Sequence, residues 1–186
     1  MTEQPGLRIR LADPDRDATP VAAIYRPAVE SSIVSFEEVA PAPDEMAARI
    51  RATLARTPWL VAEEANEVVG YAYAGQHRER AGYRWSVDVS AYVHPDRHRR
   101  GIGRQLYGVL VPTLRRQGFV NAYAGIALPN PASVALHTSI GMRRIGIYQR
   151  VGYKFGAWHD VAWFGMRLSH PAEPPAEPIP LPALGA

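Results

Sequence analysis

One segment, from Tyr92 to Arg104, constrains the fold of this chain more than any other. It leaves a strand-like run, turns through basic residues and two glycines, Gly101 and Gly103, and enters a run with helical periodicity. Glycine lets a backbone approach a ligand closely, and the first turn of a helix offers free N–H groups and a positive dipole end to an anion. The segment therefore predicts a strand–turn–helix unit whose turn can hold a pyrophosphate.

The motifs of other phosphate-binding turns fit this segment less well. A dinucleotide fingerprint requires a third glycine three residues after Gly103, where the chain has Leu106. A Walker A loop requires Gly-Lys-Ser or Gly-Lys-Thr, which the sequence lacks. The alternative is a basic surface turn whose glycines only reverse the chain. Positive charge in the turn comes from the side chains of His98, Arg99, Arg100 and Arg104.

Strand and helix patterns alternate along the rest of the chain. Alternating and β-rich runs predict strands at 7–11, 59–63, 68–74, 85–93, 120–126, 143–150 and 160–168. Helical spacing and N-terminal prolines predict helices from about Pro20, from about Pro43, over 104–117 and from Asn130 to a stop at Gly141. We expect Pro27 to break or kink the first helix and Pro112 to bend the third. The mixed order predicts an α/β fold with antiparallel hairpins and at least one strand–helix–strand unit.

The size and composition of the chain exclude several classes of protein. Its 186 residues suit one domain, which we place at 1–170, and the Pro-rich stretch 171–186 is expected to be a disordered tail. The absence of Cys excludes an enzyme thioester, Cys-ligated metals and disulfides. A net charge of +3 is weak support for nucleic acid binding, and we expect none. Because no signal peptide or membrane-spanning run is found, we predict a cytoplasmic protein.

Two residues are candidates for proton transfer. Alternation along 85–93 places Asp88 on a face of a central strand, where a carboxylate is costly unless it is used or paired. Asp88 is therefore a candidate base, and the alternative is a salt-bridged or solvated aspartate. His137 lies four residues after Ser133 on one face of a short helix, and imidazole titrates near neutral pH. The alternative for His137 is a purely structural role.

Several motifs together resemble the GNAT superfamily of N-acetyltransferases. The turn Arg100-Gly101-Ile102-Gly103 matches the acetyl-CoA pyrophosphate loop of that superfamily, Gln/Arg-x-x-Gly-x-Gly/Ala, with His98 at its first position. The phosphinothricin N-acetyltransferase branch is the most similar, from about Leu7 to Leu168. The other stretches that carry the resemblance are Ser35-Phe36-Glu37, Tyr92-Val93, Leu106-Tyr107, Gln117-Gly118-Phe119, Leu128-Pro129-Asn130-Pro131-Ala132-Ser133-Val134-Ala135-Leu136-His137 and Gly152-Tyr153-Lys154-Phe155-Gly156-Ala157-Trp158-His159-Asp160-Val161.

The resemblance implies a GNAT fold, in which a mixed, mostly antiparallel central sheet is flanked by helices and splays at the acetyl-CoA site. It implies acetyl-CoA as cosubstrate, no metal, a homodimer, and direct acetyl transfer in a ternary complex to the amine of a small amino acid or its phosphinate, sulfone or sulfoximine analogue. The implied cofactor contacts are Tyr92, Val93, His94, His98, Arg99, Arg100, Gly101, Ile102, Gly103, Arg104, Asn130 and Ser133. The implied catalytic residues are Asp88, His137 and Tyr107, and the implied substrate contacts are Phe36, Arg78, Arg80, Tyr83, Tyr92 and Val161.

Individual roles follow from the same resemblance. Tyr107 is expected near the thiol, Asn130 on the pantetheine arm, and the backbone N–H of Val93 on the acetyl carbonyl. The branch has His at the position of His137, and usually Glu at the position of Asp88. The shorter side chain of Asp88 favours proton transfer through a water.

Three other functions remain open. A different amine, such as a polyamine, an aminoglycoside or a protein N-terminus, keeps the fold and changes the substrate. A cationic substrate favours an acidic mouth, and the Arg-rich loop 77–84 argues against one. A non-catalytic acyl-CoA-binding module has no use for Asp88 and His137. A nucleic-acid binder predicts strongly salt-dependent binding to DNA or RNA.

Overall fold

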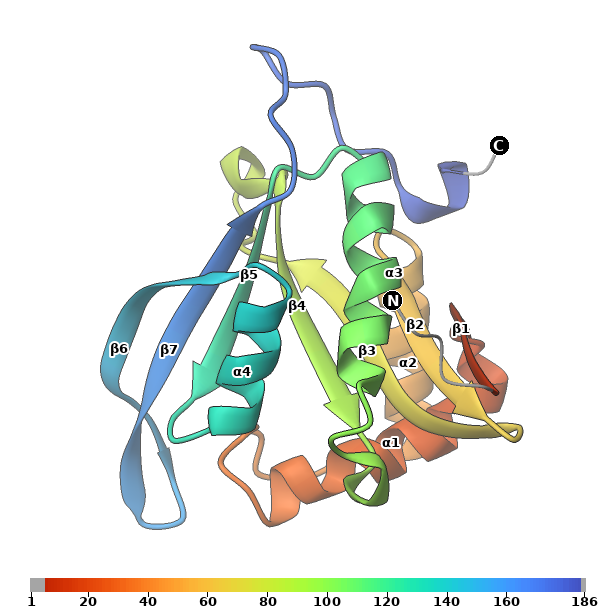
Figure 1. The fold of residues 1–186 in the computed structure, drawn as a ribbon, viewed down its shortest axis with the longest axis vertical. Coiled ribbons are helices and arrows are strands. Elements are labelled where there is room, and N and C mark those ends of the chain that lie inside the picture. The colour runs from red at the N-terminus through yellow and green to blue at the C-terminus, as the bar shows by residue number, and fades with distance from the viewer. Residues whose placement is uncertain (1–5, 185–186) are drawn as a thin grey trace.

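Seven β-strands hydrogen-bond into one sheet in the computed structural model, which describes residues 6–184 (Figure 1). Their order across the sheet is β1-β2-β3-β4-β5-β7-β6, and every neighbouring pair is antiparallel except β4 and β5. The strands are β1 (Leu7–Leu11), β2 (Trp59–Glu64), β3 (Glu67–Gln76), β4 (Ser86–Val93), β5 (Asn121–Ala127), β6 (Arg143–Lys154) and β7 (Ala157–Arg167). The predicted mixed, mostly antiparallel sheet is confirmed.

Helices cover both faces of the sheet, α3 and α4 on one and α1 and α2 on the other (Figure 1). No helix within the described residues is long and apolar enough to cross a membrane. The helices are α1 (Pro14–Glu30), α2 (Pro43–Leu54), α3 (Ile102–Arg116) and α4 (Pro131–Ser139), with short 3₁₀ turns η1 (Ala81–Tyr83), η2 (Pro95–Arg97) and η3 (Leu181–Ala183).

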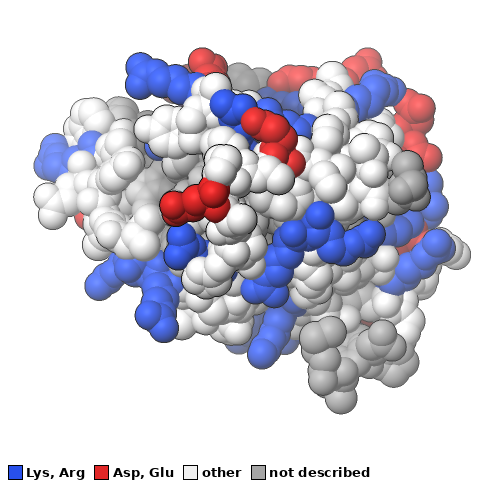
Figure 2. All heavy atoms as spheres, turned by 90° about the horizontal axis from the view of Figure 1, so that it is seen from above, with Lys and Arg blue, Asp and Glu red and all other residues white. Residues whose placement is uncertain are grey.

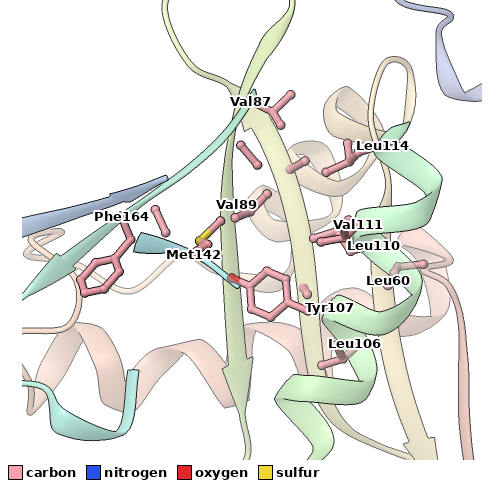
Figure 3. Close-up of a cluster of buried hydrophobic side chains, with 14 of the residues drawn as sticks. Leu60, Val87, Val89, Leu106, Tyr107, Leu110, Val111, Leu114, Met142 and Phe164 are labelled. Atoms are coloured by element: carbon pink, nitrogen blue, oxygen red, sulfur yellow. The ribbon is translucent and has the colours of Figure 1, made fainter. Parts of the chain in front are cut away.

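The two faces of the sheet carry separate cores because side chains alternate along each strand. On β4, Val87 and Val89 belong to the core beneath α3, which also contains Leu110 and Phe164 (Figure 3). Tyr92 packs against the other core, which α1 and α2 cover. Asp88, between Val87 and Val89, therefore lies on the α1–α2 face.

The sheet opens between β4 and β5. These parallel strands pair only from Ser86 with Asn121 to Asp88 with Tyr123. Beyond Asp88, β4 keeps its partner β3 as far as Val93. The splay expected from the resemblance is therefore present, and it begins at Asp88.

The first helix differs from its prediction. It begins at Pro14 rather than near Pro20, because the Asp13 side chain accepts the N–H groups of Asp15 and Arg16 and Pro14 occupies the first turn. The expected break at Pro27 is wrong, since α1 continues to Glu30.

Part of the C-terminal segment, for which composition predicts disorder, makes hydrogen bonds with the domain. Ile179 N–H donates to the Gln117 carbonyl, and the buried Gln117 amide donates to the carbonyls of Ile179 (2.8 Å) and Arg56 (2.7 Å). Trp85 Nε1 donates to Ala176, so the segment 176–184 lies against the ends of α3 and β4. A Pro-rich segment has few N–H donors of its own, and the side chains of Gln117 and Trp85 donate to its carbonyls instead. The last residues of the expected tail, 185–186, lie outside the described residues.

Candidate active site

The turn before α3 has the geometry of an anion cradle. Gly101 caps the helix with φ +75°, a left-handed conformation that favours glycine. The first intrahelical bond runs from Gln105 N–H to Gly101 carbonyl, and no side chain of residues 6–184 caps the preceding N–H groups. Gly103 also lies against α4, because a Cβ there would be 2.9 Å from Leu136 Cδ2. It allows α4 to pack closely against α3.

The basic side chains of the turn divide into two groups. Arg99 and Arg104 are exposed. Arg97 donates to Glu64 at 3.0 Å, and Arg100 Nη1 lies 3.7 Å from the same carboxylate. His94 Nδ1 accepts the N–H of Asp96 within η2. The positive charge around the cradle is thus partly offset by Glu64.

Val93 presents its backbone to the splay. His94 N–H donates to Val69 carbonyl at 2.9 Å, so Val93, opposite Gly70, stands in a non-bonded pair of the antiparallel ladder. Its N–H and C=O therefore point away from β3, toward the side from which β5 has separated. His98 Nε2 donates to the Val93 carbonyl at 2.9 Å, which departs from the expected contact with the cofactor.

The structure joins Tyr107, His137 and Ser133 beneath the splay. The Ser133 carbonyl can only accept, so it takes the N–H of His137 Nδ1 at 2.7 Å. The other ring nitrogen, Nε2, then accepts the Tyr107 hydroxyl at 2.9 Å. Tyr107 is 1% and His137 5% exposed, and burial lowers the pKa of His137 and raises that of Tyr107. The pair is thus neutral, buried and connected. Asn130 caps the same helix by accepting Ser133 N–H, as predicted.

Asp88 lies at the start of the splay on the other face and has a partner that the sequence analysis missed. His77 Nδ1 is 2.6 Å from Asp88 Oδ1. Burial raises the pKa of Asp88, and the hydrogen bond with His77 and the charge of Arg78 act in the opposite direction. His77 follows β3 directly, and its cross-strand position beside Asp88 depends on the β3–β4 register, for which the sequence carries no local signal.

The loop after β3 surrounds an open hollow of about 560 Å³. Of the predicted substrate contacts, Arg78, Arg80 and Tyr83 line it together, with His77 as a further wall. This end of the molecule carries both signs of charge interspersed with uncharged groups (Figure 2). The hollow therefore combines the cationic Arg78 and Arg80 with the carboxylate of Glu79 and the imidazole of His77.

Phe36 reaches the site from the loop between α1 and α2 and is held by the β6–β7 hairpin. Lys154 Nζ donates to the carbonyls of Ser35 (2.7 Å) and Glu37 (2.9 Å), which fixes the loop on both sides of Phe36. The Phe36 ring lies over Gly152, where a Cβ would be 2.4 Å from the ring.

The remaining predicted substrate contacts, Val161 and Tyr92, lie on the face of the sheet that α1 and α2 cover. Val161 on β7 lies beside Gly125, near Trp163. Tyr92 packs edge-on against Tyr25, with ring centroids 5.0 Å apart. Neither side chain approaches the cradle, although the backbone at the end of β4 leads into it.

Comparison with known proteins agrees with this geometry. Residues 9–163 match the family described as acetyltransferase (GNAT) domain. The chain belongs to the GNAT acetyltransferases. This GNAT chain is 37% identical to phosphinothricin N-acetyltransferase of Streptomyces viridochromogenes over 164 residues, covering 88% of this chain and 90% of the relative.

Two further proteins match this chain over almost the whole length of both sequences. The L-methionine sulfoximine/L-methionine sulfone acetyltransferase of Salmonella typhimurium is 36% identical, covering 91% of this GNAT chain and 99% of the relative. A GNAT phosphinothricin acetyltransferase from Sinorhizobium meliloti, solved in complex with acetyl-CoA, superposes with a TM-score of 0.84 at 31% identity. It covers 97% of this chain and 100% of that one.

Proposed function

We propose that this chain transfers the acetyl group of acetyl-CoA to the amino group of a small amino acid or of an analogue of the phosphinothricin or methionine sulfoximine and sulfone type. The observation that carries the proposal is the position of the splay. It begins at Asp88 beside the basic hollow and ends at Val93 beside the cradle, so one gap leads from an amine site to a phosphate site. The names of the similar proteins support the same substrate class.

The residues of the cradle suit acetyl-CoA. The N–H groups of Ile102, Gly103 and Arg104 precede the first intrahelical bond and face an anion at the helix start. Arg99 and Arg104 are exposed and can add charge to a pyrophosphate. The Val93 N–H, free of β3, can donate to the acetyl carbonyl, and Asn130 and Ser133 border the same gap. Acetyl-CoA supplies the thioester, and no Cys is required of the chain.

Proton transfer divides between the two faces of the sheet. The amine of an amino acid is mostly protonated at neutral pH, so its proton leaves toward the side of the gap that carries Asp88 and its partner His77 before the nitrogen attacks. On the other face, Tyr107 donates a proton to the leaving sulfur. His137 orients the Tyr107 hydroxyl, which its unprotonated Nε2 accepts, and Tyr107 regains its proton from water. Transfer is direct, in a ternary complex.

Substrate selection falls to the hollow. Arg78 and Arg80 can bind a carboxylate or phosphinate at two points, and Tyr83 closes the loop beside them. Phe36, Val161 and Tyr92 bound the apolar side. These cationic groups favour an anionic amino acid over a polyamine or an aminoglycoside.

We also propose that the protein is a homodimer whose interface is the β6 edge. This edge strand is exposed over nearly its whole length and carries Ile145, Ile147, Tyr148 and Tyr153, with Ile145 61% exposed. A long apolar edge strand is an aggregation hazard unless a partner covers it, and a second copy can pair with it around a two-fold axis. Sedimentation equilibrium should give twice the chain mass for the wild type and a monomer for Ile147→Lys. A monomeric wild type contradicts the proposal.

The cytoplasmic location stays a prediction from the sequence.

A thiol-release assay tests the function. Because the chain has no Cys, a thiol reagent reports only released coenzyme A. We expect release with phosphinothricin, methionine sulfoximine, methionine sulfone or an ordinary amino acid, and little with polyamines or aminoglycosides. Arg80→Ala should raise the amine KM, whereas Arg26→Ala, an exposed arginine of α1, is the matched control. If no amine of the panel causes coenzyme A release, the proposal is overturned.

A further inference from the structure

His77 stands where it can reach both Asp88 and the amine site. It is the first residue after β3, and its N–H pairs with Ser86 of β4. Gly75 lies directly opposite Asp88, so His77 is the diagonal neighbour of Asp88 on the same face. Because Gly75 has no side chain, the imidazole can lean across the ladder onto the carboxylate.

The bond to Asp88 fixes which nitrogen of His77 carries the proton. A carboxylate oxygen can only accept, so Nδ1 carries the hydrogen of the 2.6 Å bond to Asp88 Oδ1. In the neutral ring, Nε2 then holds a free lone pair. No hydrogen bond among residues 6–184 engages Nε2. The arrangement is that of an imidazole base oriented by a carboxylate.

The surroundings of His77 hold the ring and leave it in reach of ligand. Tyr123 of β5 lies 4.6 Å from its ring centroid, and Tyr83 and Trp163 lie 6.0 and 6.2 Å away edge-on. His77 lines the open hollow together with Arg78. The ring is thus fixed by packing and by Asp88, while its side chain remains 15% exposed.

We propose that His77 is the catalytic base that takes the proton from the substrate amine, and that Asp88 acts through it as the positioning residue. This rests on the function proposed above and names the atom that performs one of its steps. Nε2 of His77 accepts a proton from the ammonium group, which leaves the lone pair on the amine nitrogen. That pair forms the new N–C bond, the C–S bond breaks with its electrons going to sulfur, and sulfur takes a proton. His77 returns its own proton to solvent through the open hollow.

Kinetics test the assignment with His77→Phe, which keeps the aromatic packing and removes both nitrogens, and with His77→Ala. We expect kcat/KM at neutral pH to fall by about 10²–10⁴-fold. The loss should shrink as pH rises toward the pKa of the substrate amine, because free amine then needs no base. The titratable and charged groups around His77 are Asp88, Tyr83 and Tyr123, with Arg78, Glu79 and Arg80 in the same hollow, and none of them should replace it.

A double-mutant cycle separates the two roles. If Asp88 acts through His77, Asp88→Asn should lower kcat/KM in the wild type and change it little in the His77→Phe background. Equal effects of Asp88→Asn in both backgrounds overturn the assignment, as does a His77→Phe variant with the wild-type rate and pH profile. His170→Ala, an exposed histidine far along the chain, is the matched control.

The free protein gives a readout that does not depend on turnover. A two-bond ¹H–¹⁵N spectrum should show His77 protonated at Nδ1 when neutral, and Asp88→Asn should change that pattern. A neutral His77 protonated at Nε2 in the wild type overturns the assignment. Failure of the wild type on every amine of the panel would instead remove the proposed function, so the two failures are distinguishable.

Discussion

Two histidines on opposite faces of one sheet are held in opposite ways. His137 gives both ring nitrogens to neutral groups, Tyr107 and the Ser133 carbonyl, and is 5% exposed. His77 gives one nitrogen to a carboxylate, and the side chain of that carboxylate, Asp88, is 34% exposed. We call His137 with Tyr107 the buried pair and His77 with Asp88 the open pair. Neutral partners in a buried pair suppress charge, whereas an open pair with a carboxylate exchanges protons with water.

The stability of the protein should depend on pH in opposite directions at the two pairs. The pKa of His137 is lowered on folding, so its contribution is complete above the ordinary value of about 6.5 and is lost as pH falls below it. The pKa of Asp88 is raised, so its ionisation costs stability as pH rises above the ordinary value of about 3.9. The open pair is thus placed at a thermodynamic cost, which is consistent with the proton transfer proposed for it.

The largest effect is expected from the buried pair. His137→Ala should reduce kcat by about 10²–10⁴-fold and lower the free energy of unfolding by about 2–5 kcal/mol, because it leaves a cavity and two unpaired polar groups. Steady-state kinetics and thermal unfolding measure both. Tyr107→Phe keeps the packing and should lose turnover with a smaller loss of stability. Ser139→Ala, exposed on the same helix, is the control. Wild-type turnover in both variants would remove this pair from the mechanism.

The open pair should separate activity from stability. Asp88→Asn should lower kcat/KM by about 10²-fold, because the amide no longer fixes the tautomer of His77. It should leave Tm at pH 7 unchanged or raise it, since the desolvated charge is gone. Scanning calorimetry at pH 7 and pH 4 checks the sign, because the difference from wild type should shrink at the lower pH. A large fall in Tm at pH 7 would show that Asp88 is a structural ion-pair partner.

Each pair was predictable from the sequence only in half. Asn130-Pro131 marks a helix start, and spacing places His137 on the same helix face as Ser133. Its partner Tyr107 lies 30 residues away on α3, beyond the reach of local rules. Asp88 followed from strand alternation. His77 did not, because its partner lies eleven residues away across a ladder whose register no local pattern sets.

The same limit explains the other differences. Composition predicts disorder for the tail, and it gives no sign of the hydrogen bonds that the tail makes with Gln117 and Trp85, which lie far away in sequence. The start of α1 was available in the sequence as Asp13-Pro14 and was placed too late. The strand–turn–helix unit around Gly101 lies where the sequence predicts it, whereas the packing of Gly103 on Leu136 depends on how α3 and α4 meet.

A smaller effect is expected on the amine side of the site, where the open pair lies, and none on the acetyl-CoA side. Gly152→Ala places a Cβ against the Phe36 ring, which must move because its loop is tied to Lys154. We expect the amine KM to rise about tenfold, within the ~1–3 kcal/mol that a pocket contact contributes, with the acetyl-CoA KM unchanged. Gly146→Ala on the same strand has open space and is the control. An equal rise in both KM values would mean that Phe36 is shared by the two ligands.

The smallest effect on turnover is expected from the tail. Ending the chain after His170 removes the bonds of Gln117 with Ile179, though not its bond to Arg56, and the bond of Trp85 to Ala176; polar groups that lose a partner at a buried site cost about 1–3 kcal/mol. For a chain of this size that lowers Tm by roughly 2–12 °C. Trp85 and Arg84 connect η1 to β4, so the amine KM should rise about threefold while the buried pair and the acetyl-CoA KM are unaffected. Glu177→Gln, which weakens only the exposed contact with Arg84, is the control, and its Tm should stay near wild type. If truncation changed the acetyl-CoA KM instead, the tail would support the cradle side of the sheet, and the two pairs would not be as independent as their positions indicate.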